Sequence, residues 1–386
     1  MGRVMGSVIK GVGLEERDLR FGRVALEMAA AELDGLLVYS PAWRRENFRY
    51  LSGAPLRSSA GMVFLPAAGA ATAFVISLED EAAVRNAGFI EDVRQLRLLD
   101  IGPLGARIRE SGRRLTLGVA GLEFMPHRVR RHLVEALPEA KLVPASSLLD
   151  RLRRVKSDWE IAQLRQAGRI CDAAWKAFVA ACQPGAREFE IVARVEATLR
   201  MLGGEDNFML IASGGTEVRG MTPPSDRRLA IGDMVRTELT PQWNGYWTQI
   251  CRTAVLGKPN DRQRRSFELF DEAVAAGLAV LRPGVTAHEV AKAENDVFRK
   301  HGYGDYCSAE YTRVRGHCLG LHFDEVPILE GVETVLERNA VVIVHPNTFT
   351  PLAGYHVLGD PVVVTEHGAE KLIATPREFD QVPIDG

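Results

Sequence analysis

The sequence is poor in cysteine and has no long uninterrupted apolar run. Its five cysteines are spread over 386 residues and form no C-x-x-C pair, which argues against a disulfide framework and against a structural zinc site. No apolar run approaches the ~18 residues that span a bilayer, and the N-terminal stretch lacks the apolar core of a signal peptide. We therefore expect a cytoplasmic protein that neither spans nor binds a membrane.

A surplus of charge of one sign is also absent. The 48 lysine and arginine residues nearly cancel the 50 aspartate and glutamate residues, and the formal net charge is -2. Without a strong positive field the chain has no general attraction for nucleic acid. The partner that we expect is a small-molecule substrate.

What the chain does contain is the composition of a globular protein with two domains. Hydrophobic residues make up 46% of the 386 residues, and this length suits two domains. Residues 1–152 alternate helical spacing with short apolar runs such as GLLVYS and GMVFLPA, which predicts an α/β domain. Ser157 and Glu160 have the spacing of a helix-capping box near the start of the second domain, residues 153–386.

The second domain contains an internal repeat. Residues 182–206 and 281–305 match at a constant offset of 99, and each copy reads as a Pro-Gly turn, a helix and a glycine stop. The matching positions are Pro184/Pro283, Gly185/Gly284, Glu190/Glu289, Leu199/Phe298, Arg200/Arg299, Gly203/Gly302 and Asp206/Asp305. Such a repeat predicts two related α/β halves that share one sheet, with a cleft where they meet.

The stretch WNGYW, residues 243–247, lies between two extended arms. Asn-Gly is the strongest short signal for a hairpin turn. The hairpin would place Glu238 on one arm, and Gln249 and Arg252 on the other. We expect this hairpin to line the cleft.

Several motifs together resemble the family of methionine aminopeptidase, prolidase, aminopeptidase P and creatinase. They are KSDWEIAQLRQAG at the domain junction, QPGAREFEI, GYWTQICRTAVLG, RPGVTAHEV, GHCLGLHFDEVP and VVVTEHGAEKL. The resemblance covers essentially the whole chain. It implies an α/β N-terminal domain of the creatinase and prolidase type, followed by the pseudo-symmetric pita-bread domain.

The metal-ligand positions of that family are altered in this chain. The resemblance implies that its metallopeptidases hold two metal ions with an Asp before the hairpin, an Asp after it, a His in a Gly-His motif and two Glu on the last strands. The corresponding residues here are Glu238, Gln249, His317, His345 and Gly359. Since two-metal hydrolysis needs several anionic oxygens, the sequence argues against a dinuclear peptidase.

The first interpretation is therefore a creatinase-like enzyme that works without a metal or another cofactor. It would hydrolyse a C–N bond of a small non-peptide substrate, or cleave that bond by elimination. Imidazole exchanges protons near neutral pH, so His317 and His345 would be the acid-base pair. Glu238 and Gln249 would orient these rings or stabilise developing charge.

Two alternatives remain open. Glu238, His317 and His345 are the ligand set of a 2-His-1-carboxylate site, which would hold a single iron, manganese or zinc ion. The other alternative is a pseudoenzyme that uses the fold for binding or assembly. Burying a polar group costs free energy unless the group is hydrogen-bonded or takes part in binding or catalysis. The polar residues at four of the five family positions therefore argue against a site that has lost its function by random mutation.

Five further residues are predicted to contact the substrate. Met221 and Asp324 occupy positions at which the resemblance implies accessory histidines. Trp247 would offer an aromatic surface beside the cleft, and Arg252 would bind an anion, with a structural role as the alternative. Arg57 lies near the place from which creatinase-type enzymes bring an arginine of the partner subunit, and this likeness implies a homodimer.

Overall fold

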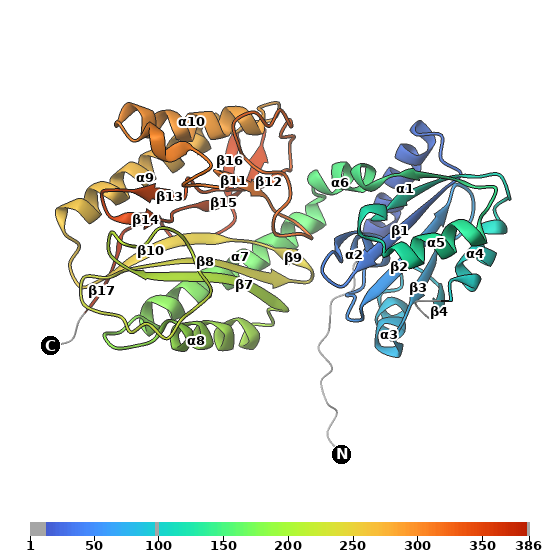
Figure 1. Ribbon diagram of the computed structural model, residues 1–386, viewed down its shortest axis with the longest axis horizontal. Coiled ribbons are helices and arrows are strands. Elements are labelled where there is room, and N and C mark those ends of the chain that lie inside the picture. The colour runs from blue at the N-terminus through green and yellow to red at the C-terminus, as the bar shows by residue number, and fades with distance from the viewer. Residues whose placement is uncertain (1–12, 97–99, 384–386) are drawn as a thin grey trace, which may run out of the picture. The chain divides into compact units, whose positions relative to one another are not determined.

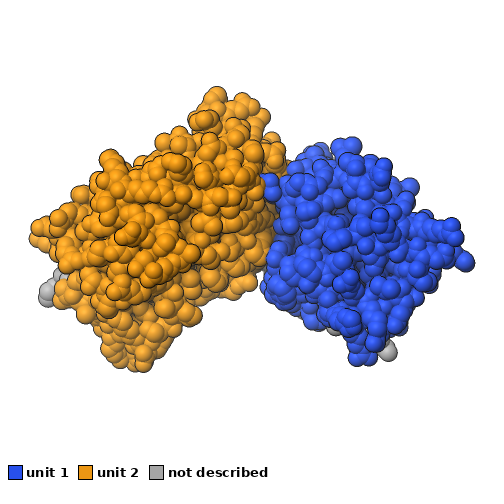
Figure 2. Space-filling view, turned by 45° about the horizontal axis from the view of Figure 1, so that its top comes forward, with its two compact units in different colours: residues 1–154 blue, residues 155–386 orange. Residues whose placement is uncertain are grey.

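The computed structural model describes residues 13–96 and 100–383. The chain divides into two compact units, residues 1–154 and residues 155–386 (Figure 2). Within the described part, no helix is long and apolar enough to cross a membrane. Each unit has its own sheet and its own buried apolar residues.

Unit 1 is built around a mixed six-stranded sheet with the order β4-β3-β2-β1-β5-β6. The strands are β1 (Gly35–Pro41), β2 (Ala60–Pro66), β3 (Thr72–Val75), β4 (Asp92–Gln95), β5 (Thr116–Ala120) and β6 (Lys141–Pro144). The helices are α1 (Leu14–Ala30), α2 (Glu46–Ser52), α3 (Leu78–Ala87), α4 (Gly102–Arg109), α5 (His127–Ala136) and α6 (Ser146–Arg154), with a short 3-10 turn, η1 (Leu122–Phe124). β1 and β2 are the predicted apolar runs and are buried throughout, as strands covered on both faces should be. The α/β prediction is confirmed.

Unit 2 has two helix pairs on opposite sides of its strands (Figure 1). One pair is α7 (Asp158–Ala181) and α8 (Glu188–Met201), and the other is α9 (Asp261–Val280) and α10 (Ala287–Lys300). The bounds of α8 and α10 differ by the 99 residues of the sequence repeat. Ser157 and Glu160 form the expected capping box at the start of α7. Each helix pair packs on its own apolar core, around Ile191 in one half and Phe270 in the other.

The strands of unit 2 form two main sheets and a short ribbon. The five-stranded sheet contains β7 (Asp206–Gly214), β8 (Met234–Trp243), β9 (Tyr246–Trp247), β10 (Ile250–Leu256) and β17 (Asp380–Val382). The four-stranded sheet contains β11 (Gly316–Cys318), β12 (Val341–Val344), β15 (Asp360–Thr365) and β16 (Gly368–Lys371). β13 (Thr348–Thr350) pairs with β14 (Gly354–His356), and η2 (Gly304–Cys307) follows α10.

The expectation of one shared sheet needs a correction at the junction of the two halves. An isolated bridge joins them, and there the N–H of Gly359 donates to the carbonyl of Cys251 over 3.0 Å. Between the five-stranded and the four-stranded sheet, the described strands are thus joined by an isolated bridge instead of a continuous ladder. Glu238 in β8 pairs with Cys251 in β10 and therefore lies beside this junction.

Candidate active site

The hairpin of β8, β9 and β10 positions Glu238 and Gln249. Asn244 and Gly245 have φ angles of 47° and 85°, which is what a two-residue type I′ turn requires. Antiparallel pairing sets Glu238 opposite Cys251. Nε2 of Gln249 donates to Sγ of Cys251 over 3.3 Å, so the three side chains lie on the same face of the hairpin.

Two histidines lie side by side on the other half of the unit. His317 is the middle residue of β11, and His345 directly follows β12. A Cβ atom at Gly316 would lie 2.2 Å from the carbonyl oxygen of Ile343, so the glycine of the Gly-His motif lets β11 approach β12. The ring centroids of the two histidines are 5.3 Å apart, with the planes at 71°.

Burial keeps both imidazoles neutral. It lowers the pKa of His317 to about 4, and it lowers the pKa of His345 well below its ordinary value, with the neighbouring His317 as a second cause. A neutral imidazole accepts a proton or binds a metal ion through its unprotonated nitrogen. Nδ1 of His345 is buried and has no hydrogen-bond partner among the described residues. Such an atom is costly to leave unsatisfied, and a bound ligand would relieve that cost.

Glu238 faces these rings with a single amide donor. Burial raises the pKa of Glu238, although the hydrogen bond from Asn347 opposes this shift. Nδ2 of Asn347 donates to Oε1 of Glu238 over 2.8 Å, while its Oδ1 accepts the backbone N–H of Leu358 over 3.0 Å. The backbone bond fixes which way the Asn347 amide points. Asn347 therefore presents a donor to Glu238.

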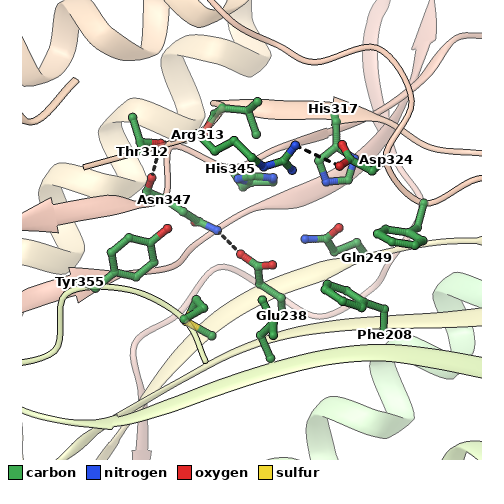
Figure 3. A pocket seen from close by; sticks show the side chains of 14 residues that line it. Phe208, Glu238, Gln249, Thr312, Arg313, His317, Asp324, His345, Asn347 and Tyr355 are labelled. Carbon is green, nitrogen blue, oxygen red and sulfur yellow. Dashed lines mark hydrogen bonds and ion pairs between the residues drawn. The ribbon is translucent and has the colours of Figure 1, made fainter. Parts of the chain in front are cut away.

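These side chains line a cavity of about 490 Å³ (Figure 3). The predicted residues Glu238, Gln249, His317 and His345 all line it, and so do Met221 and Asp324. The other lining residues are Phe208, Leu210, Thr312, Arg313, Val314, Phe323, Asn347 and Tyr355. Tertiary structure thus brings both halves of the repeat to one cavity.

Three residues that the sequence predicted to contact substrate do not line the cavity. Arg252 is fully buried, and its guanidinium is bonded to Asp360 and to backbone carbonyls, including that of Gly359. Trp247 packs edge-on against Phe323 with ring centroids 5.5 Å apart. Arg57 belongs to unit 1, where its backbone N–H donates to Asp80.

Sequence reasoning missed Arg313, Asn347 and Tyr355 as cavity residues. Asn347 follows His345 at a spacing of two, which is the period of side chains on one face of an extended segment. Arg313 lies in the same segment as His317, four residues earlier. Nothing local in the sequence signals Tyr355, because its place depends on the packing of the β13–β14 ribbon.

The five family positions do not assemble a two-metal centre. Gly359 has no side chain, and a Cβ atom there would lie 2.5 Å from the carbonyl oxygen of Val344 and 2.5 Å from Cβ of His345. Gln249 offers a neutral amide where the family uses a carboxylate. In the described part of the chain, no three His, Cys, Asp or Glu side chains are grouped so that they would hold a metal ion. A dinuclear centre therefore does not fit these residues.

The sequence matches known families over most of its length. Residues 162–366 match Metallopeptidase family M24, and residues 20–155 match the Creatinase/Prolidase N-terminal domain. The Xaa-Pro dipeptidase of Pyrococcus furiosus is 32% identical over 267 residues, which are 68% of this chain and 75% of that protein. The probable dipeptidase PepE of Mycobacterium tuberculosis is 30% identical over 370 residues, 94% of this chain and 96% of that protein.

Solved structures of similar proteins share the fold over most of this chain. An Xaa-Pro dipeptidase from Bacillus anthracis superposes with a TM-score of 0.82 at 25% identity, covering 95% of this chain and 99% of the other. The prolidase from Pyrococcus horikoshii OT3 gives the same score and identity over 94% and 99%. The predicted combination of a creatinase-type N-terminal domain and a pita-bread domain is confirmed.

These relatives correct the first functional interpretation. They are named as dipeptidases and prolidases, within a metallopeptidase family. The prediction of a metal-independent, creatinase-like reaction on a non-peptide substrate is therefore wrong, and elimination has no support. Hydrolysis is the part of the prediction that agrees with the relatives.

Proposed function

This chain belongs to Metallopeptidase family M24, and from that premise we propose that it hydrolyses short peptides with the help of a single metal ion. The observation that carries the proposal is the meeting of Glu238, His317 and His345 at one cavity, where Nδ1 of His345 is buried without a partner. The names of its relatives extend the proposal to dipeptides of the Xaa-Pro type.

The donor atoms suit one ion. Two neutral imidazoles and one carboxylate are a ligand set used for single iron, manganese or zinc ions, and Asn347 would orient the carboxylate of Glu238. Such an ion would polarise the peptide carbonyl as a Lewis acid. Since the described residues contain no ready-made group of three ligands, the proposal requires these side chains to draw together when the ion binds.

The remaining cavity residues would hold and orient the peptide. Nε2 of Gln249 is engaged by Cys251, which leaves its amide oxygen to accept an N–H of the ligand. Phe208, Leu210 and Met221 offer apolar contact for a side chain. The Tyr355 hydroxyl points into the cavity (Figure 3), and burial raises its pKa, so it would donate a hydrogen bond rather than ionise.

A second candidate function is peptide binding without turnover. The observations that favour it are the glycine at position 359 and the amide at position 249, because both remove anionic oxygens from family ligand positions. On this alternative the cavity recognises a peptide and releases it intact. Metal content and turnover separate the two candidates.

The test compares the wild-type protein with His317→Ala, His345→Ala and the control His367→Ala, which changes an exposed histidine. We expect about one metal ion per chain by mass spectrometry and release of proline from Phe-Pro. Both should be lost in the cavity variants, with turnover reduced by about a hundredfold or more, and retained in the control. Peptide binding without metal or turnover in the wild type would favour the second candidate, and full activity in either cavity variant would refute the site.

A further inference from the structure

Tyr355, the middle residue of β14, turns its hydroxyl into the cavity (Figure 3). This hydroxyl forms no hydrogen bond with the described residues. Other donors of the cavity wall are already engaged: Nδ2 of Asn347 donates to Glu238, and Oγ1 of Thr312 donates to backbone carbonyls. Nε2 of Gln249 donates to the sulfur of a buried cysteine. The hydrogen of the Tyr355 hydroxyl is therefore left for a ligand.

The backbone of Tyr355 is held from both sides. Its N–H donates to the carbonyl of Val218 over 2.8 Å, and its carbonyl accepts a hydrogen bond from Nε of Arg236. Arg236 is fully buried and also donates to the carbonyls of Gly214 over 3.1 Å and Ala353 over 2.9 Å. The guanidinium thus ties β14 to the end of β7. A donor on a backbone that is fixed in this way needs little reorganisation when a ligand reacts beside it.

The surroundings of Tyr355 keep its hydroxyl protonated. Burial raises the pKa of Tyr355 above its ordinary value of 10.0, and the nearby Glu238 and Cys251 raise it further. A protonated phenol donates a hydrogen bond. Such a bond becomes stronger when its acceptor becomes an anion, so this donor distinguishes a charged oxygen from a neutral one.

Peptide hydrolysis creates an anionic oxygen. The oxygen of water bonds to the carbonyl carbon, and the π electron pair of the C=O bond moves onto the carbonyl oxygen. When that pair returns, the C–N bond breaks and the nitrogen leaves with a proton from the attacking water. Figure 3 shows the Tyr355 hydroxyl pointing toward the side of the cavity on which Glu238 and His345 lie. A peptide bond placed between these side chains would have its oxygen within reach of the hydroxyl.

We propose that Tyr355 is a catalytic residue whose hydroxyl donates a hydrogen bond to the oxygen of the scissile peptide bond as negative charge develops on it. The hydroxyl keeps its own proton throughout. This inference rests on the proposed function, since it takes a peptide bond as the reacting group. A donor that acts mainly on the charged stage lowers the barrier without tightening the binding of the substrate. Its loss should therefore change kcat and leave KM nearly unchanged.

The experiment compares the wild type with Tyr355→Phe, which removes only the hydroxyl. Tyr306→Phe is the matched control, because Tyr306 is also partly buried and packs against Phe349, the cross-strand partner of Tyr355, but does not line the cavity. Release of proline from Phe-Pro gives kcat and KM, and mass spectrometry gives the metal content. Inhibition by a phosphinate analogue of Phe-Pro, in which a tetrahedral anionic group replaces the reacting carbonyl, measures the binding of the developing charge. Thermal unfolding checks that each variant keeps its fold.

We expect kcat to fall by about 10²–10³-fold in Tyr355→Phe, with KM within about twofold of the wild type. The inhibition constant of the phosphinate should rise by about tenfold or more, while metal content and thermal unfolding stay unchanged. Tyr306→Phe should behave as the wild type does.

Three results would overturn the catalytic role of Tyr355: an unchanged kcat in Tyr355→Phe, a loss of metal together with kcat, or an equal loss of kcat in Tyr306→Phe. Each of them leaves peptide hydrolysis standing, because that proposal is tested by His317→Ala and His345→Ala. If the wild type releases no proline, the proposed function fails and the inference fails with it.

Discussion

Asp360 is a fully buried carboxylate and Glu238 a half-buried one, and the two lie in opposite electrostatic surroundings in the same unit. Asp360 meets Nη2 of Arg252 at 2.7 Å, Nζ of Lys371 at 2.7 Å and Nη1 of Arg377 at 2.8 Å. Burial alone would raise the pKa of Asp360, but Arg252 and Lys371 outweigh it and the pKa is lowered. Glu238 has one amide donor, and burial raises its pKa.

The difference shows that the buried charges that pair at the junction of the two halves are distinct from the polar groups that line the cavity. Arg252 and Asp360 directly follow Cys251 and Gly359, the two residues of the bridge that joins the halves. Their charges are paired within the protein, so they have nothing left to offer a ligand, and removing one partner would leave a buried charge uncompensated. Glu238 accepts one amide hydrogen bond, from Asn347. Nδ1 of His345 is buried without a hydrogen-bond partner among the described residues, which costs free energy and leaves that atom available to a ligand.

The largest loss of stability should come from breaking the charge cluster of Asp360 with Arg252, Lys371 and Arg377. Asp360→Asn leaves Arg252 fully buried without its anionic partner, and we expect the free energy of unfolding to fall by about 3–5 kcal/mol. Glu366→Gln, which breaks the exposed pair with Arg338, should change it by about 0–1 kcal/mol. Urea denaturation at pH 7 measures both. Similar small losses in the two variants would show that the cluster does not hold the junction.

The same cluster predicts acid sensitivity. Because the pKa of Asp360 is lower in the folded protein than its ordinary value of 3.8, its contribution is present above that value and is lost as the pH falls through the lowered pKa. Asp360→Asn should therefore remove part of the stability loss between neutral and acidic pH. Parallel stability curves for wild type and variant would contradict this linkage.

A smaller loss of stability should follow from adding a side chain at the tightly packed junction. Gly359→Ala introduces a Cβ atom 2.5 Å from the carbonyl oxygen of Val344, and overpacking of this kind costs about 1–3 kcal/mol. Gly22→Ala in α1, where a Cβ atom meets nothing within 4 Å, should instead stabilise by about 0.5–1 kcal/mol. Thermal unfolding distinguishes the two signs. A neutral Gly359→Ala would mean that the strands can move apart to admit a side chain.

The last effect concerns Glu294, another fully buried carboxylate of unit 2. Both of its oxygens are buried without a hydrogen-bond partner among the described residues, and burial raises its pKa well above 4.5. A raised folded pKa means that stability falls as the pH rises from 4.5 toward that pKa. Glu294→Gln should remove this fall, so that the free energy of unfolding of the variant changes less than that of the wild type between pH 4.5 and pH 7, as measured by urea denaturation at several pH values. An unchanged pH profile would show that Glu294 stays neutral through another interaction.

Much of the architecture could be predicted because its signals are local. The Asn-Gly turn predicted the hairpin that carries Glu238 and Gln249, and apolar runs predicted the strands of unit 1. Alternation of side chains along a strand also contained an unused signal: Cys251 lies opposite Glu238, so the next residue, Arg252, points to the other face. That alternation would have predicted that Arg252 pairs with groups inside the protein and does not contact the substrate.

Turn residues, hydrophobic periodicity and motif spacing predicted the helices and strands, the altered ligand positions and the family, because these signals belong to residues that are neighbours along the chain. Packing between distant segments brought Asn347, Arg313 and Tyr355 to the cavity, paired Arg252 with Asp360 and left Gly359 without room for a side chain. Those facts depend on distances of a few ångströms between segments that are far apart along the chain, and such distances are set by packing.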